Sequence, residues 1–226
     1  MRTPTAEISH AKDSRLWDFA AASPTTIQCL FGAAGFAILI HRQLSEHANL
    51  ALGLRIASEI SSILFLLFQV LLICIRSLPS AKAAGLAPRL WAILGSTFSY
   101  LVLLLPKIIP TPTESILSSI LILTGTAASI WVLTSLRRGF SIFPQARVLV
   151  TTGPYRIVRH PLYLAEQISA FGIALQFQQP LGILIVLAGF FLQFPRMHYE
   201  ETVLRASFPS YHSYFSHTRR IIPFVY

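Results

Sequence analysis

The chain has 226 residues, of which 54% are hydrophobic and 12% are charged, and its mean hydropathy is +0.61. A soluble domain usually carries about 25% charged residues, so this composition excludes an ordinary water-soluble globular protein. The formal net charge of +9 is distributed between apolar runs without a recognised nucleic-acid-binding motif. We therefore assign the basic residues to membrane topology and to contact with membrane lipids, and we expect no nucleic acid as a partner.

Apolar runs in the first 136 residues predict transmembrane helices. Residues 1–24 are polar, contain no signal peptide and are expected to form a loosely ordered N-terminal arm. A helix needs roughly 17–25 apolar residues to cross a bilayer, and the first run reaches that length when extended by a residue or two. We expect 25–136 to be a four-helix transmembrane region, with spans at 25–40, 56–75, 91–109 and 115–136.

The C-terminal region, 137–226, has a different character. An arginine-rich stretch from 137 to 159 is followed by two short apolar runs, 162–177 and 181–194, which are separated by Gln-Gln-Pro. Each run is shorter than a comfortable span, so we expect a tight helical hairpin packed against the first four helices. An amphipathic, aromatic tail follows from Arg196. The predicted fold class is therefore an all-α integral membrane protein with about four transmembrane helices, a C-terminal helical hairpin and an amphipathic tail.

The distribution of Lys and Arg predicts the orientation in the membrane. Three such residues lie in the N-terminal arm, three in the loop after the second span and five in the stretch after the fourth span. The two intervening loops hold fewer. Because cytoplasmic loops carry an excess of Lys and Arg, we expect the arm, the second loop and the arginine-rich stretch on the cytoplasmic side. The expected location is a bacterial inner membrane, or the endoplasmic reticulum in a eukaryote.

Polar residues gather first in the segment Leu-Val-Thr-Thr-Gly-Pro-Tyr-Arg-Ile-Val-Arg-His-Pro-Leu-Tyr at 149–163. Gly153-Pro154 indicates a turn, and Pro161 suits the first position of a helix. His160 then lies at a helix N-terminus, where free N–H groups favour the carboxylate or phosphate of a ligand. Helical spacing places His160, Tyr163 and Gln167 on one face. The same pattern also suits a helix start anchored at the membrane interface, and spacing alone leaves both readings open.

The second polar segment is Arg-Met-His-Tyr-Glu-Glu at 196–201. Arg196 and Glu200 share a helix face, whereas Glu201 points about 100° away. Two adjacent carboxylates at the end of a membrane helix are not needed for packing, although an interfacial ion pair between Arg196 and Glu200 is the simpler alternative. The tail histidines, His198, His212 and His217, match no standard ligand spacing, so we predict no metal site.

Together the two segments resemble the isoprenylcysteine carboxyl methyltransferase family of membrane methyltransferases. The resemblance rests on 149–156, 158–163, Glu200-Glu201 and the closing Arg-Ile-Ile-Pro-Phe at 220–224, and it covers roughly 137–226. It implies S-adenosylmethionine as the methyl donor, bound at the cytoplasmic membrane surface. It also implies a lipophilic small molecule or a lipidated substrate as the acceptor, such as an isoprenylcysteine-type carboxylate.

Site residues follow from the resemblance by position. It implies a catalytic Arg196 facing the substrate, and a cofactor site made of Arg147, Val148, Leu149, Val150, Tyr155, His160, Pro161, Leu162, Tyr163 and Glu200. The segment between Gly139 and Arg147 is shorter than in eukaryotic members of the family, so the acceptor does not carry over automatically. Aromatic residues of the tail, among them Tyr211 and Tyr214, are expected to lie across the pocket as an interfacial lid.

Two other functions compete with methyl transfer. A membrane reductase of the sterol-reductase type carries a related Arg-His-Pro-x-Tyr stretch and uses NADPH, but the 2′-phosphate of NADPH prefers basic partners to Glu200-Glu201. A non-catalytic membrane protein or small transporter is disfavoured because the sequence has no internal repeat.

Overall fold

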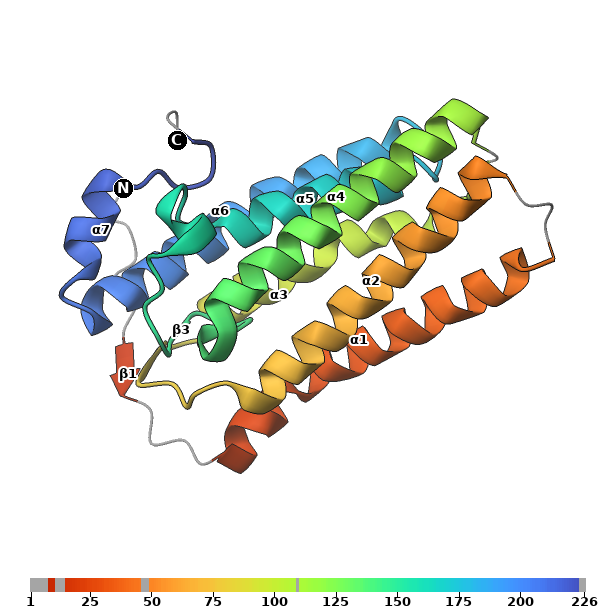
Figure 1. The fold of residues 1–226 in the computed structure, drawn as a ribbon. Helices are drawn as coiled ribbons and strands as arrows, with labels where there is room; N and C mark the ends of the chain where they lie inside the picture. Colours follow the sequence, from red (N-terminus) through yellow and green to blue (C-terminus); the bar gives the residue numbers. More distant parts are fainter. Residues whose placement is uncertain (1–7, 11–14, 46–48, 109, 224–226) are drawn as a thin grey trace.

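The computed structural model describes residues 8–10, 15–45, 49–108 and 110–223, and it is a bundle of long helices with a small sheet at one end (Figure 1). The helices, in chain order, are α1 (Arg15–Gln43), α2 (Leu50–Ile75), α3 (Ala87–Thr97), η1 (Phe98–Leu104), α4 (Pro112–Leu136), η2 (Arg137–Gly139), η3 (Gly153–Arg156), α5 (Pro161–Ala174), α6 (Leu181–Ser207) and α7 (Tyr211–His217).

Five helical segments within the described residues are long and apolar enough to cross a membrane. They are Asp18–Gln43, Leu50–Ile75, Ala87–Leu104, Pro112–Gly139 and Leu181–Ser207. The protein is thus a multi-pass, all-α membrane protein, as predicted. The third segment changes from α-helix to 3-10 helix at Phe98, which the apolar pattern of the sequence did not indicate.

Two helix boundaries differ from those predicted. Helix α1 begins at Arg15, so residues 15–24 are helical although we expected a loosely ordered arm there. Helix α6 continues from Leu181 through Pro195 to Ser207, so the second helix of the expected hairpin is a full-length span, whereas its partner α5 has only 14 residues. Beyond Phe194, the last turns of α6 carry polar residues that contact polar protein groups, such as Glu201 with Arg159 and Arg220.

A buried ion-pair cluster explains the early start of α1. Asp18, in its first turn, accepts from Nε of Arg76 at 2.7 Å and from Nη2 of Arg147 at 2.5 Å. All three side chains are buried. Because an unpaired charge is costly to bury, Asp18 extends the helix into a polar stretch by pairing with both arginines.

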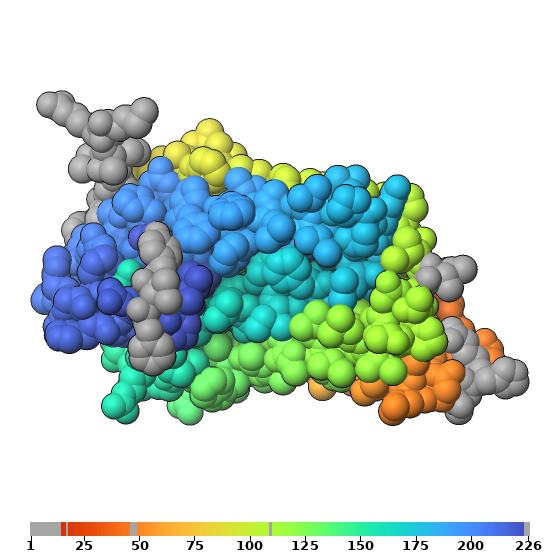
Figure 2. Space-filling model, turned by 90° about the horizontal axis from the view of Figure 1, so that it is seen from above, coloured from red at the N-terminus to blue at the C-terminus, as the bar shows by residue number. Residues whose placement is uncertain are grey.

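The long helices pack in the order α1, α2, α4, α5, α6 and α3, with η1 also against α6. Figure 2 shows three of them, α6 in blue, α5 in teal and α4 in green, lying side by side on one face. Small residues bring α4 and α5 close together: a Cβ atom added to Gly125 would lie 2.3 Å from Oγ of Ser169. Ser118 Oγ also donates to the Gly172 carbonyl at 2.7 Å. Small residues and interhelical hydrogen bonds are what holds helices together in lipid, so α5 is firmly placed.

A three-stranded antiparallel sheet joins distant segments at one end of the bundle. The strands β1 (Ile8–His10), β2 (Ala81–Ala83) and β3 (Gln145–Ala146) lie side by side in that order. The sequence did not predict them, because two or three residues carry too little pattern to read as a strand. The sheet places Ile8–His10, the α2–α3 connection and the arginine-rich stretch at the same end, which is the grouping that the Lys and Arg distribution predicted.

Candidate active site

A cleft of about 820 Å³, counting its open mouth, lies at the sheet end of the bundle. Most of the predicted site residues line it: Val148, Leu149, Val150, Tyr155, His160, Leu162, Tyr163, Arg196 and Glu200. Residues more than fifty positions apart are thus brought together by the packing of α5 against α6.

Arg147 and Pro161, which were also predicted as cofactor residues, do not line the cleft. Arg147 is turned into the ion-pair cluster with Asp18, and its guanidinium also donates to the Ser77 carbonyl. Pro161 is buried as the first residue of α5. Both residues support the walls of the cleft and do not face its interior.

The turn before α5 sets the direction in which the chain runs along one wall of the cleft. Gly153 has a φ of +63°, a conformation that favours glycine, and it begins the short helix η3. The chain then pairs with the tail, since Arg159 N donates to the Arg219 carbonyl at 2.8 Å and His160 N to the Arg220 carbonyl at 2.9 Å. The His160 side chain does not cap α5. The free N–H groups at the start of this helix, beside the cleft, therefore receive no hydrogen-bond acceptor from His160.

Glu200 is the carboxylate of the cleft. Its Oε1 accepts from the Tyr163 hydroxyl at 2.5 Å and from Nε of Arg196 at 3.2 Å. Its Oε2 lies 3.8 Å from Nδ1 of His160, and the side chain remains 19% exposed. His160 and Tyr163 stack with ring centroids 5.4 Å apart. Glu200 is therefore oriented from one side and open to a ligand on the other.

Arg196 has several protein partners in addition to Glu200. Its guanidinium lies over the Tyr163 ring, 4.7 Å from the centroid, and Nη2 donates to the Ile142 carbonyl at 3.1 Å. The residue is only 5% exposed. Arg196 is thus a buried, well-held cation at the edge of the cleft.

The neighbouring Glu201 has a different role that the sequence did not reveal. It is buried, and its carboxylate accepts from Arg159 at 3.0 Å and from Nη2 of Arg220 at 2.6 Å, with Nε2 of His160 3.2 Å away. Arg205 lies a turn further along at 3.9 Å. Glu201 therefore fixes the tail and the start of α5 to α6.

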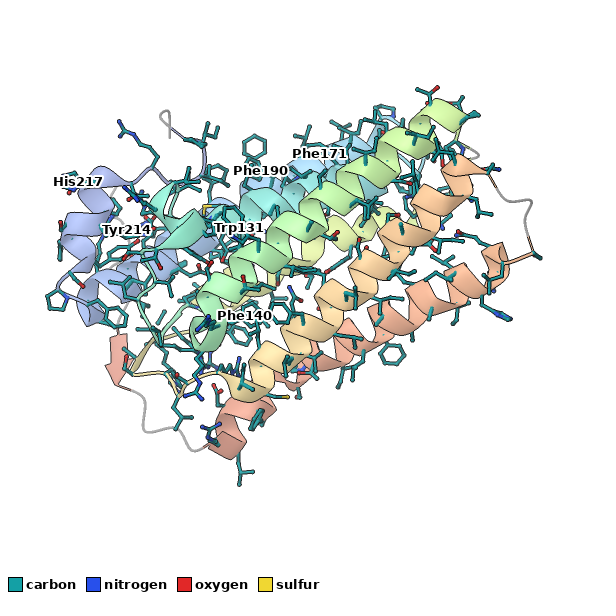
Figure 3. All side chains as sticks on the ribbon, viewed as in Figure 1. Trp131, Phe140, Phe171, Phe190, Tyr214 and His217 are labelled. Carbon is teal, nitrogen blue, oxygen red and sulfur yellow. The ribbon has the colours of Figure 1, made fainter. Side chains whose placement is uncertain are left out.

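Two tail tyrosines form part of the cleft wall, as the predicted lid requires. Tyr211 and Tyr214 line the cleft, and the Tyr214 hydroxyl donates to the Tyr155 carbonyl at 2.6 Å. Figure 3 shows Tyr214 on α7 at the sheet end, whereas Phe171 and Phe190 lie further along the bundle. Burial raises the pKa of Tyr155, Tyr211 and Tyr214 well above that of a free tyrosine, and nearby carboxylates raise it further. These hydroxyls therefore stay protonated at neutral pH and act as neutral hydrogen-bonding groups.

The segment before Arg147 also contributes to the cleft, which its sequence did not indicate. Ser141, Phe143 and Gln145 line the cleft. The Gln145 Oε1 accepts from Ser141 at 3.0 Å and from Arg147 at 2.6 Å. Strand β3, which holds Gln145 in place, is the feature that would have been needed to predict this.

A comparison with protein families gives a match over less than half of the chain. Residues 113–210 match the family described as phospholipid methyltransferase, which belongs with the isoprenylcysteine carboxyl methyltransferase-like membrane enzymes. The matched region is that of a membrane methyltransferase. The resemblance drawn from the sequence is thereby confirmed at the level of this broad family. A comparison with curated proteins found no match.

The matched region starts before the stretch that carries the resemblance and ends before the tail. The match starts at residue 113, so it includes α4 together with α5 and α6 and contains every predicted site residue. The first three helices lie outside it. Within the described residues, no group of three or more His, Cys, Asp or Glu side chains is arranged to hold a metal ion.

Proposed function

We propose that this methyltransferase uses S-adenosylmethionine to methylate a lipophilic acceptor within the membrane. The observation that carries the proposal is Glu200, a partly exposed carboxylate held by Tyr163 and Arg196 in a cleft with aromatic walls. The cleft lies at one end of a bundle of membrane-spanning length, where a water-soluble donor and a lipid-soluble acceptor can both reach it.

The residues present fit this donor. S-adenosylmethionine carries a sulfonium cation, an ammonium group and a carboxylate, and when bound it supplies an electrophilic methyl group. Tyrosine rings attract cations, and Tyr155 provides one in the cleft wall. Glu200 offers an acceptor for the ammonium group or for ribose hydroxyls. The N-terminus of α5 at His160 suits the carboxylate.

The protein then contributes mainly by orientation. Arg196 and Tyr163 hold Glu200, and the tail tyrosines cover one side of the cleft. Alignment of an acceptor nucleophile with the methyl group is the main demand of such a transfer, and fixed positioning of this kind lowers its entropic cost. In this arrangement Arg196 positions Glu200, which binds the donor, and Arg196 also borders the side of the cleft where the acceptor enters.

The resemblance also suggests an isoprenylcysteine-type carboxylate as acceptor, held by Arg196. The guanidinium of Arg196 already contacts Glu200, the Ile142 carbonyl and the Tyr163 ring, so such an acceptor would have to use its remaining N–H groups. We place the sheet end of the bundle in the cytoplasm, because it carries the arginine-rich stretch.

Methyl transfer tests the proposal directly. Detergent-purified protein is incubated with S-adenosylmethionine labelled in its methyl group and with a total membrane lipid extract, and label in the organic phase is counted. We expect time-dependent incorporation by the wild type and its loss with Glu200→Ala. Absence of transfer, together with oxidation of NADPH under the same conditions, would favour a reductase instead.

A further inference from the structure

Helix α1 lies outside the region that matches the methyltransferase family, yet it reaches the wall of the cleft. Asp18, in its first turn, is buried and pairs through Oδ1 with Nη2 of Arg147 at 2.5 Å. One turn further along α1, Ala22 is buried in the same hydrophobic cluster as Phe140 and Leu162, and Leu162 lines the cleft. Two separate contacts thus join α1 to the part of the chain that forms the cleft.

The contact made by Asp18 continues through Arg147 to the cleft wall. The same Nη2 atom of Arg147 donates to Oε1 of Gln145 at 2.6 Å, and Oγ of Ser141 donates to that oxygen at 3.0 Å. Gln145 and Ser141 line the cleft, whereas Arg147 does not. Arg147 therefore links a buried carboxylate of α1 to two polar side chains of the cleft wall.

These contacts determine which end of the Gln145 amide faces Arg147. A guanidinium group has only N–H donors, so the amide atom beside it is the oxygen and the NH2 group points the other way. Within the described residues, Nε2 of Gln145 has no hydrogen-bond partner, and it is not among the buried polar atoms closed off from solvent. Because Gln145 is only partly exposed and lines the cleft, this NH2 group is presented to the cleft.

The Gln145 NH2 group suits a ligand that supplies a hydrogen-bond acceptor. S-adenosylmethionine carries several acceptors, namely its carboxylate, its ribose oxygens and the ring nitrogens of adenine. Glu200 cannot bind the carboxylate or the ring nitrogens, because a glutamate carboxylate only accepts hydrogen bonds. An amide that is already held in one orientation binds such a group at a lower entropic cost than a mobile side chain.

We propose that Gln145 is a ligand-binding residue of the cleft and that Asp18 of α1 is a positioning residue for it, acting through Arg147. The inference rests on the proposed function, because the ligand is the methyl donor. The Asp18 carboxylate holds Arg147 against Oε1 of Gln145, and the NH2 group stays turned towards the donor. Without that carboxylate Arg147 loses its counter-charge and the amide is free to rotate, so the donor loses a hydrogen bond.

A purely structural explanation is that Asp18 only fastens α1 to α2 through Arg76. A second buried polar contact between the same two helices provides a matched control. Nε2 of Gln43 donates to Oε1 of Glu59 at 2.8 Å, and both side chains are buried. Gln43 is the last residue of α1, and that end of the helix lies away from the sheet (Figure 1). Gln43→Leu therefore loosens α1 from α2 without touching the cleft.

The experiment titrates S-adenosylmethionine into the full-length protein in detergent by calorimetry, with the unfolding midpoint of each variant measured in parallel. We expect Gln145→Met to weaken donor binding roughly five- to tenfold and Asp18→Asn roughly threefold or more, because each removes or disorders one hydrogen bond. The double variant should bind no more weakly than Gln145→Met alone, since both changes act on the same contact. Gln43→Leu should lower the unfolding midpoint and bind the donor as the wild type does.

Gln145→Glu tests the orientation of the amide separately. The glutamate keeps an oxygen for Arg147 and Ser141 but replaces the NH2 group with a second oxygen. We expect weaker donor binding at an unfolding midpoint no lower than that of the wild type. If Asp18→Asn does not fold, Asp18→Glu, which keeps the charge but shifts the carboxylate, takes its place beside Gln145→Met.

Three results would overturn the inference. One is a Gln145→Met or Gln145→Glu protein that binds the donor as well as the wild type. Another is a double variant whose loss is the sum of the two single losses, because Asp18 would then act independently of Gln145. The third is a Gln43→Leu protein that loses as much affinity as Asp18→Asn. Each of these needs a wild type that binds S-adenosylmethionine and so leaves the proposed function intact. A folded wild type that binds none would instead remove the proposed function and the inference together.

Discussion

Two adjacent glutamates in α6 serve different purposes because a helix turns about 100° at each residue. Glu200 faces the cleft, where Tyr163 and Arg196 hold it and 19% of its side chain stays exposed. Glu201 faces the tail and is enclosed by Arg159, His160 and Arg220. We infer that the first is a ligand-binding group and the second a structural one, although in the sequence they are indistinguishable.

The structural role of Glu201 predicts a stability change. Glu201→Gln removes the buried counter-charge of two partly buried arginines, Arg159 and Arg220, and removing one partner of a buried ion pair costs about 3 kcal/mol or more. We expect a clear fall in the thermal unfolding midpoint in detergent. The matched control is Glu200→Gln on the same helix, which should lower the midpoint much less. Equal midpoints for the two variants would contradict the assignment.

Because Arg196 holds Glu200, replacing Arg196 is predicted to change the affinity for the donor. Arg196→Ala removes the cation that orients Glu200, so we expect S-adenosylmethionine to bind about tenfold more weakly, in line with the loss of a hydrogen bond to a charged group. Arg196→Lys keeps the charge but lacks the planar guanidinium, so its donor affinity should lie between those of the wild type and Arg196→Ala. If donor affinity is unchanged and only the Michaelis constant for a carboxylate acceptor rises, Arg196 acts on the acceptor instead.

At the scale of elements, close packing of α4 and α5 positions the cleft. A Cβ atom on Gly125 would meet Ser169 Oγ at 2.3 Å and the Ala165 carbonyl at 2.8 Å, whereas nothing lies within 4 Å of the same position on Gly35. Gly125→Ala should therefore push α5 outward at a cost of about 1–3 kcal/mol and weaken donor binding. Gly35→Ala in α1 should affect neither the unfolding midpoint nor the affinity. A Gly125→Ala protein as stable as wild type would show that the interface adapts.

The sequence predicts these elements unevenly. Apolar runs locate the long helices, and Pro161 marks the first residue of α5, because both signals are local. The long α6 and the early start of α1 are missed, since their polar ends are stabilised by partners far away in the chain, such as Arg76 and Arg147 for Asp18. For the same reason Glu201 and Gln145 could not be assigned: their roles depend on Arg220 and on the pairing of β3 with β2.

At the scale of the whole molecule, the sheet and the tail close one end of the bundle around the cleft. The sheet joins residues 8–10, 81–83 and 145–146, and the tail contributes Tyr211 and Tyr214 to the cleft wall. The opposite end holds the end of α1, the start of α2 and the connection at 174–181. In the proposed function, this polarity gives one end of the bundle to a water-soluble donor and leaves the long apolar helices to a lipophilic acceptor.

Removal of the tail is also predicted to weaken binding of the donor. Truncation before Ser207 removes both tyrosines, and we expect at least a tenfold loss of donor affinity because an aromatic wall of the cleft is lost. The truncation also removes Arg220, so Tyr211→Ala, which keeps the Glu201 contacts, is needed beside it. Donor binding that survives both changes would rule out a lid formed by the tail.

The most direct measurement is calorimetric titration of S-adenosylmethionine into the detergent-purified wild type, with Glu200→Ala and His160→Ala measured in parallel. The proposed site predicts saturable binding by the wild type and its loss in both variants, while circular dichroism shows that they remain helical. A folded wild type that binds no S-adenosylmethionine, or variants that bind it as well as the wild type, would contradict the assignment of this cleft as the donor site.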